Sequence, residues 1–183
     1  KSGVSPLENS PIADPTNDVT QGESFSVSSG LHLTEGVELE ISGYPYPGVH
    51  LGVAINLMDN EFREKDDPNY GKSIDGSVDE QYSVFANYEI QGGYWKGLSL
   101  GATFLDVGTR HFISPVDQNQ LYLAGYNRVD LNMGYKGFPG WDISLLVRNV
   151  MDEKYIESAS SNYFLGNYYG APRAALLKAM FSF

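Results

Sequence analysis

Hydrophobic and polar residues alternate along seven segments of the chain, and stretches rich in Gly, Pro, Asn and Asp separate these segments. Alternation with a period of two puts successive side chains on opposite faces of a β-strand. The pattern therefore predicts an all-β chain with seven strands, near residues 34–43, 48–58, 81–91, 98–104, 128–135, 141–148 and 172–183.

The seventh segment ends the chain on an aromatic residue. One face of this predicted strand carries Ala175, Leu177, Ala179, Phe181 and Phe183. A terminal strand of this kind is typical of outer-membrane β-barrels, whose closed sheets pair every backbone polar group inside the lipid. We therefore expect Phe181 and Phe183 to act in barrel assembly and insertion.

The predicted strands also separate charge by face. Their apolar faces carry no charged residue, whereas the opposite faces carry Glu38, Glu40, Glu89, Arg128, Asp130, Asp142, Arg148 and Lys178. A Lys or Arg that faces lipid at the bilayer midplane costs about 2–4 kcal/mol, so the wall of a transmembrane barrel needs this segregation. A soluble β-sandwich or a lipocalin-like barrel also alternates, and it is the alternative interpretation of the pattern.

The connections between the predicted strands fall into two length classes. Short connections at 42–48, 91–97 and 136–140 alternate with long ones at 59–80, 106–125 and 151–171. Transmembrane barrels have short periplasmic turns and long external loops. The short connections hold the aromatic residues Tyr44, Tyr46, Tyr94, Trp95, Phe138 and Trp141. We expect these rings to form a girdle at the inner membrane interface.

Strand directions then predict what is missing. If Phe183 ends at the periplasmic side, the first predicted strand begins outside, and residues 1–33 form an external loop. Closed bacterial barrels have an even number of strands and begin in the periplasm. We therefore expect residues 1–183 to be the C-terminal part of a larger antiparallel barrel, cut or split in an external loop.

Composition narrows the class further. The net charge of −11 argues against nucleic-acid partners, and the absence of cysteine excludes disulfides and thiolate metal sites. The uncharged stretch 158–172 contains Ser, Asn, Gly and Pro and is shorter than the roughly 18 apolar residues that a spanning helix requires. The chain opens with Lys1 and a polar stretch, and no apolar targeting segment is visible there. We therefore expect a mature protein or a piece of a longer one.

Four stretches carry a resemblance to a known family. They are Gly36-Val-Glu-Leu-Glu40, Arg128-Val-Asp-Leu-Asn-Met-Gly-Tyr135, Leu145-Leu-Val-Arg-Asn-Val-Met-Asp-Glu-Lys-Tyr155 and Gly170-Ala-Pro-Arg173. In their order and spacing they resemble the C-terminal barrel region of TonB-dependent outer-membrane receptors, especially those for ferric siderophores. Met151 departs from the pattern, since such receptors often have Phe, Leu or Thr before the Asp.

The resemblance implies a barrel of about 22 strands with a plugged lumen. The plug and the box that engages TonB would lie in a missing segment or chain, through which TonB would act. The other implied partners are the lipid and lipopolysaccharide of the outer membrane and an iron chelate. The implied function is import of a ferric siderophore or similar metal chelate. A small pore or adhesin barrel is the alternative, and an outer-membrane hydrolase is the third possibility.

Candidate ligand-binding residues are the aromatic residues of the long connections. The segment 158–170 combines Tyr163, Phe164, Tyr168 and Tyr169 with amide and hydroxyl groups, which suits capture of a ferric chelate. Tyr122, Tyr126 and Phe112 are further candidates of the same kind. The alternative for all of them is an outer aromatic girdle at the headgroup level, without a role in recognition.

Other chemistry has weaker support in the sequence. The acidic connection 59–80 lacks the spacing of an EF-hand, so we expect a solvated charged loop that disfavours anionic ligands. His32, His50 and His111 stand outside any hydrolase or metalloprotease motif. We expect Arg128, Asp130, Asp142 and Arg148 to form a charge ladder on the lumen face. No catalytic, cofactor-binding or metal-binding residue is assigned.

Overall fold

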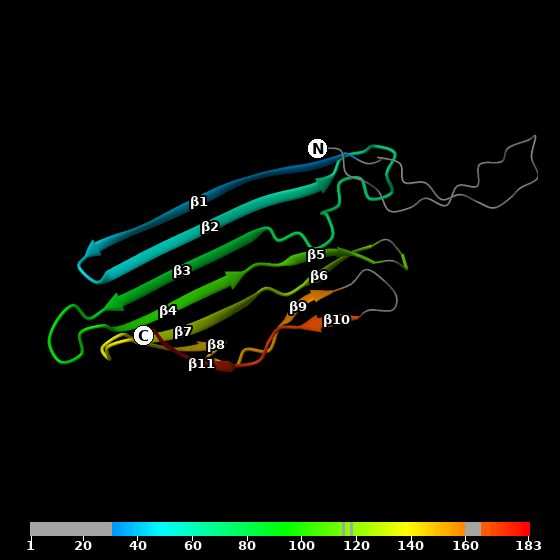
Figure 1. The fold of residues 1–183 in the computed structure, drawn as a ribbon. Helices are drawn as coiled ribbons and strands as arrows, with labels where there is room; N and C mark the ends of the chain where they lie inside the picture. Colours follow the sequence, from blue (N-terminus) through cyan, green and yellow to red (C-terminus); the bar gives the residue numbers. More distant parts are fainter. Residues whose placement is uncertain (1–30, 115, 118, 160–165) are drawn as a thin grey trace, which may run out of the picture.

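The computed structural model describes residues 31–114, 116–117, 119–159 and 166–183. Its main element is a curved, open sheet of seven antiparallel strands in the order β1-β2-β3-β4-β7-β8-β11 (Figure 1). The strands are β1 (His32–Tyr46), β2 (Val49–Phe62), β3 (Glu80–Glu89), β4 (Leu98–Val107), β7 (Tyr126–Tyr135), β8 (Trp141–Arg148) and β11 (Ala174–Phe181). Two small sheets stand apart from it, the β5–β6 pair (Arg110–Ile113 with Gln120–Leu123) and the β9–β10 pair (Ile156–Ala159 with Asn167–Tyr169).

All seven predicted strands are present, so the expected all-β antiparallel class is confirmed. β1 begins at His32, so the last two residues of the segment expected as an external loop belong to a strand, whereas residues 1–30 of that segment lie outside the described residues. The β5–β6 and β9–β10 pairs lie within connections that were expected to be loops. Their strands have three or four residues, which is too short for a period of two to be recognised.

The two ends of the sheet differ (Figure 1). The turn end carries the short turns 47–48, 90–97 and 136–140 together with Phe183. The loop end carries segment 63–79 and the two small strand pairs. The aromatic residues expected as an inner girdle all belong to the turn end and are exposed, with Tyr94 at 87% and Tyr44 at 75%.

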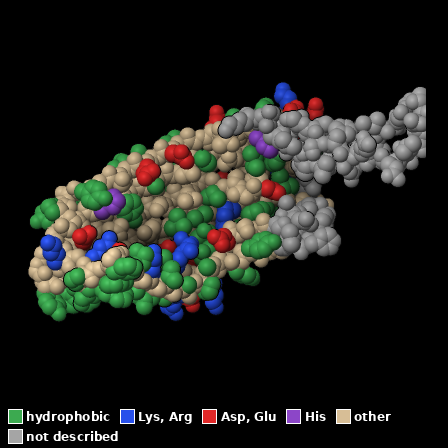
Figure 2. Space-filling view, in the orientation of Figure 1, with side chains coloured by type: hydrophobic (Ala, Val, Ile, Leu, Met, Phe, Trp, Pro, Cys, Tyr) green, Lys and Arg blue, Asp and Glu red, His purple; other side chains and the backbone are tan. Residues whose placement is uncertain are grey.

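Strand register confirms the predicted faces. One row of paired positions crosses five strands through Ile41, Val53, Val84, Phe104 and Val129. The neighbouring row crosses the same strands through Ser42, Gly52, Phe85, Thr103 and Asp130. Because cross-strand partners share a face, an apolar surface and a more polar surface each extend across the sheet. Figure 2 shows charged side chains of both signs spread over a hollowed face.

Hydrophobic residues in this sheet are exposed to an unusual degree. Val37 is 63% exposed, Ile41 59% and Leu177 69%, and all three lie on the predicted apolar face. Among the described residues, the buried hydrophobic side chains are Val107, Phe112, Ile113 and Tyr155. Packing is therefore concentrated at the loop end, and the apolar face requires an apolar phase outside the chain.

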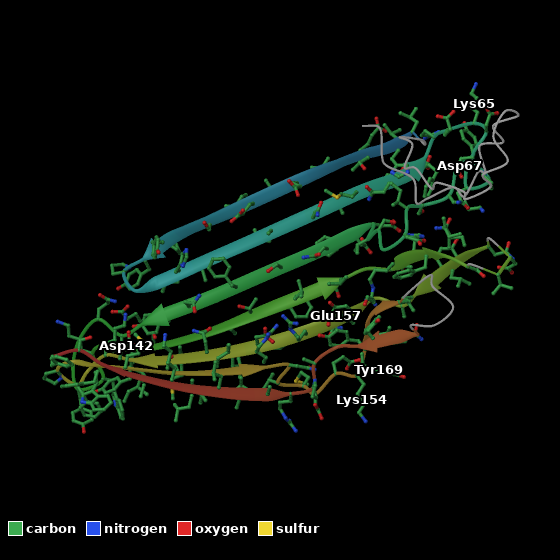
Figure 3. All side chains as sticks on the ribbon, turned by 45° about the vertical axis from the view of Figure 1, so that its right-hand side comes forward. Lys65, Asp67, Asp142, Lys154, Glu157 and Tyr169 are labelled. Carbon is green, nitrogen blue, oxygen red and sulfur yellow. The ribbon has the colours of Figure 1, made fainter. Side chains whose placement is uncertain are left out.

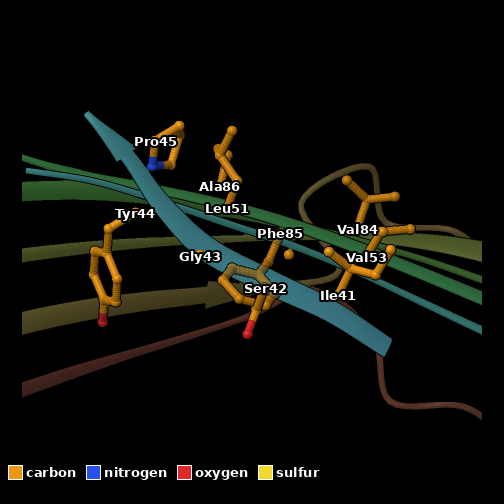
Figure 4. Close-up of a pocket in the computed structure, with 11 residues that line it drawn as sticks. Ile41, Ser42, Gly43, Tyr44, Pro45, Leu51, Val53, Val84, Phe85 and Ala86 are labelled. Carbon is orange, nitrogen blue, oxygen red and sulfur yellow. The ribbon is translucent and has the colours of Figure 1, made fainter. Parts of the chain in front are cut away.

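An apolar depression of about 570 Å³ lies on β1, β2 and β3 near the turn end. Figure 4 shows Leu51, Val84 and Ala86 on one side of the sheet and Tyr44 and Phe85 on the other. A Cβ added to Gly43, which also lines the depression, would meet no atom within 4 Å. We interpret the depression as a gap left in the apolar face by Gly43, because its lining is mostly apolar and only Ser42 and Tyr44 contribute side-chain hydroxyls.

No helix in the described part of the chain is long and apolar enough to cross a membrane.

Candidate functional site

Arg110 is the centre of the loop end. It begins β5, and only 4% of its surface is exposed. Its Nη1 donates to the carbonyl oxygens of Ile156 at 2.6 Å and Glu157 at 2.5 Å, and its Nη2 donates to the carbonyl oxygen of Ala124 at 2.7 Å. The guanidinium carbon lies 5.0 Å from the centroid of the Tyr126 ring, within the range of a cation–π contact. Arg110 thus joins β5, the connection between β6 and β7, and β9.

The ring under Arg110 belongs to a stacked tyrosine pair. Tyr126 and Tyr155 have centroids 3.8 Å apart and planes 12° from parallel. Arg128 donates from Nη1 to the Tyr155 hydroxyl at 3.5 Å. Gly170 lies directly against the pair, since a Cβ at that position would collide with the Tyr155 ring. The stack therefore connects the beginning of β7 to both ends of the segment that contains the β9–β10 pair.

Asn149 forms the turn that follows β8. It is 1% exposed, and its φ of 50° lies in the left-handed region, which Asn tolerates better than most residues. Its side-chain Nδ2 donates to the carbonyl oxygens of Glu153 at 2.9 Å and Ala171 at 3.0 Å, and its Oδ1 accepts from the Glu153 N–H at 2.9 Å. The motif Leu145–Tyr155 is therefore an architectural turn. Met151, its unusual residue, is 72% exposed and does not hold the turn together.

Segment 63–79 is attached to the β5–β6 pair. His111 Nε2 lies 2.7 Å from Asp79 Oδ2, and the Ile113 N–H donates to Asp75 Oδ1 at 2.6 Å. The Ser73 N–H donates to Gln120 Oε1 at 3.1 Å. The acidic connection was expected to be a solvated charged loop. This expectation is only partly correct, because the carboxylates of Asp75 and Asp79 bond to β5.

The residues expected to bind a ligand fall on two different strand pairs. Tyr122 lies on β6 and is 64% exposed, whereas Tyr168 and Tyr169 lie on β10 and are 49% and 77% exposed. Figure 3 labels Tyr169 at the loop end, on the strand pair that also holds Glu157. Tyr163 and Phe164 lie outside the described residues.

Two further aromatic candidates are not available to a ligand in this structure. Phe112 is 7% exposed, and Tyr126 is covered by Arg110 and Tyr155. The sequence around Phe112 and Tyr126 did not indicate this burial. It arises from packing of the two short strand pairs, which the alternation did not predict.

The expected charge ladder is not formed as one network. Arg128 Nε lies 3.1 Å from Asp130 Oδ1 on the same strand, whereas Asp142 pairs with Lys136 at 3.5 Å at the turn end. Asp130 also accepts the Asn149 N–H at 2.8 Å. The sequence indicated the shared face of these residues, but their partners depend on the turn after β8 and on the turn at 136–140.

Each of the three histidines packs against an aromatic ring. His50 stacks on Tyr44 with centroids 4.3 Å apart, and His32 meets the edge of Phe62 at 4.7 Å. The ring of His111 contacts Tyr122 at 5.2 Å. Within the described ranges, no group of three or more His, Asp or Glu could hold a metal ion.

Sequence reasoning missed the residues that organise the loop end. Arg110 was one charge in a long connection, and Asn149 and Tyr155 stood inside a family motif without an assigned role. The local sequence offers only a weak signal for Arg110, which precedes the two apolar residues Phe112 and Ile113 within a long connection.

Phe181 lies on β11, as the alternation predicted, whereas Phe183 lies beyond the end of the strand. Phe181 is paired with Trp141 across β8 and β11, with ring centroids 5.1 Å apart. The Phe183 ring lies 6.4 Å from that of Phe181, beyond the last paired residue.

Comparison with known proteins agrees with this architecture. Residues 8–150 match the family model of the TonB-dependent receptor-like β-barrel. The chain is 27% identical to the ferrioxamine B receptor of Salmonella typhimurium over 163 residues, which cover 85% of this chain and 22% of the receptor. It is 28% identical to the ferrichrome outer membrane transporter/phage receptor of Escherichia coli over 180 residues, covering 96% of this chain and 22% of the transporter.

Solved structures share the fold. The ferric yersiniabactin uptake receptor FyuA from Yersinia pestis matches with a TM-score of 0.75 at 20% identity, over 87% of this chain and 25% of that one. The pyoverdine receptor FpvA from Pseudomonas aeruginosa matches with a TM-score of 0.71 at 20% identity, over 98% and 26%. The chain spans about a fifth of the length of the curated relatives it matches. Since the family model covers most of its residues, the chain belongs to the TonB-dependent receptor β-barrel family of the outer membrane.

Proposed function

We propose that this chain is the C-terminal barrel segment of a receptor that imports a ferric siderophore or a similar metal chelate. The observation that carries the proposal is family membership together with relatives named for ferrioxamine B and ferrichrome. The loop end would then face the outside, and the polar face of the sheet would line the lumen.

The exposed tyrosines suit this role chemically. A ferric chelate presents apolar surface and oxygen acceptors together, and a Tyr side chain offers a broad ring with a hydrogen-bonding tip. Tyr122, Tyr168 and Tyr169 are exposed on strand pairs held at the loop end. We propose these three as ligand contacts, with Tyr163 and Phe164 as candidates between β9 and β10.

Such a receptor needs partners beyond this sequence. Residues 1–33, apart from the start of β1, would form an external loop. A plug, the remaining strands and the contact with TonB would belong to another segment or chain. The apolar face would meet outer-membrane lipid and lipopolysaccharide. The role is one of binding and transport without catalysis.

Uptake of radioactive iron tests the function. Iron-starved cells with and without the receptor that contains this chain would be given ferrioxamine B, ferrichrome or pyoverdine loaded with labelled iron. We expect receptor-dependent uptake of at least one chelate, abolished when TonB is deleted. Receptor-dependent uptake that persists without TonB would contradict energised import and favour the passive pore.

Two controls test the small pore and the hydrolase. Planar-bilayer recordings would show steady conductance without ligand if the protein were a small pore. Mass spectrometry of the recovered siderophore would reveal cleavage products if it were a hydrolase. We expect neither steady conductance nor cleavage.

A further inference from the structure

Arg110 is a buried cation in a region that the proposed function makes a ligand-binding surface. A buried guanidinium is costly unless its donors are bonded. Here Nη1 and Nη2 bond to three backbone carbonyls, while the buried Nε has no hydrogen-bond partner among the described residues. This arrangement holds neighbouring backbone segments and leaves almost no surface for contact with a ligand.

The three carbonyls come from two places in the chain. Ala124 follows β6, which carries Tyr122, whereas Ile156 and Glu157 begin β9, whose partner β10 carries Tyr169. The guanidinium also covers the Tyr126 ring, which stacks on Tyr155 just before β9. One side chain therefore bridges the two strand pairs and attaches both to β7.

We propose that Arg110 is a positioning residue that makes the β5–β6 and β9–β10 pairs a single rigid body. It would thereby present Tyr122 and Tyr169 at a set separation to the bound chelate. This inference rests on the proposed function. A surface ordered before binding loses less conformational entropy when the ligand arrives, and its affinity is higher for that reason.

Lysine cannot replace Arg110 in this role. The planar guanidinium directs donors from two nitrogens in a fixed fork, whereas a lysine ammonium is a single point with rotating donors. Arg110→Lys keeps the charge and loses the bridge. Arg63→Lys is the matched control, because Arg63 pairs with Glu61 at 2.8 Å on the exposed segment outside the bridge.

Spin labels would measure the rigid body directly, without ligand. The chain contains no cysteine, so labels at Leu121→Cys on β6 and Ser158→Cys on β9 are unique within it. Double electron–electron resonance would be recorded on the receptor in outer-membrane vesicles. We expect one narrow distance distribution in the parent and in Arg63→Lys, and a clearly broader one in Arg110→Lys.

Binding of ferric ferrioxamine B, ferrichrome and pyoverdine would be measured on the same variants without labels. For the probe that the parent binds, we expect Arg110→Lys to weaken affinity about tenfold, mainly through faster dissociation. Arg63→Lys should leave affinity unchanged. Tyr126→Leu, which removes the ring under the guanidinium, should also broaden the distance distribution and weaken binding. This second variant tests the inference if Arg110→Lys does not insert into the outer membrane.

The outcomes distinguish the inference from the proposed function. Unchanged distances in a correctly inserted Arg110→Lys or Tyr126→Leu would overturn the rigid body. Broadened distances with unchanged affinity would overturn the positioning role. If the parent binds none of the three probes, the proposed function and the ligand-positioning role of Arg110 are both overturned. The distance measurements still test whether Arg110 holds the two strand pairs together.

Discussion

The backbone N–H of Asn149 donates a 2.8 Å hydrogen bond to the Oδ1 of Asp130, which fixes the turn after β8 to the middle of β7. The side chain of Asn149 also holds the carbonyl of Ala171, next to Gly170 and shortly before β11. One residue therefore holds together both ends of the long connection between β8 and β11.

Replacing Asn149 should destabilise the protein strongly. Asn149→Leu removes a φ-tolerant residue and the three hydrogen bonds that the buried side chain of Asn149 makes to the backbone of Glu153 and Ala171. We expect a loss of about 3 kcal/mol in the free energy of unfolding, measured by urea titration in lipid vesicles. Asn127→Ala, at an exposed position of β7, should change it little, and equal effects of the two would contradict the role of the turn.

A lysine should affect stability differently on the two faces of β4. Phe104→Lys puts an ammonium on the apolar face and should cost about 2–4 kcal/mol in a bilayer. Thr103→Lys puts it on the polar face, where residue 103 pairs with Asp130, and should be tolerated. Unfolding of both variants in vesicles checks the assignment, and a greater loss for Thr103→Lys would reverse the faces.

Ligand affinity should depend on Tyr169. Tyr169→Ala removes a ring that is 77% exposed on β10, and we expect binding of the recognised ferric siderophore to weaken about tenfold. Equilibrium titration with the purified receptor provides the measurement. Tyr94→Ala, at the turn end and 87% exposed, is the control and should leave affinity unchanged.

Assembly should depend on the terminal aromatic residue. Phe183 lies beyond the last pair of β11 and is fully exposed. We expect Phe183→Ala to lower the amount of heat-modifiable protein in the outer membrane without changing its stability once folded. Phe138→Ala, another exposed ring at the turn end, should not lower it, and a similar loss there would indicate a general aromatic effect.

The main sheet could be predicted because its information is local. Long strands such as β2 repeat a period of two over many residues, and a shift by one residue would move every apolar side chain to the wrong face. The register accordingly places Ile41, Val53 and Val84, each from a predicted apolar face, in one row across the sheet. The terminal motif, the face segregation and the resemblance to TonB-dependent receptors followed from the same local signals.

The loop end could not be predicted in this way, because its contacts join residues distant in sequence. Arg110 bonds to carbonyls 46 and 47 residues away, and backbone carbonyls leave no mark in the amino-acid sequence. The sequence by itself determined the strands, their two faces and the membrane as solvent, because hydrophobic alternation is a local pattern within each strand. The tertiary structure decided which tyrosines are exposed and which are buried in the bridge, because burial at the loop end depends on how separate connections pack together.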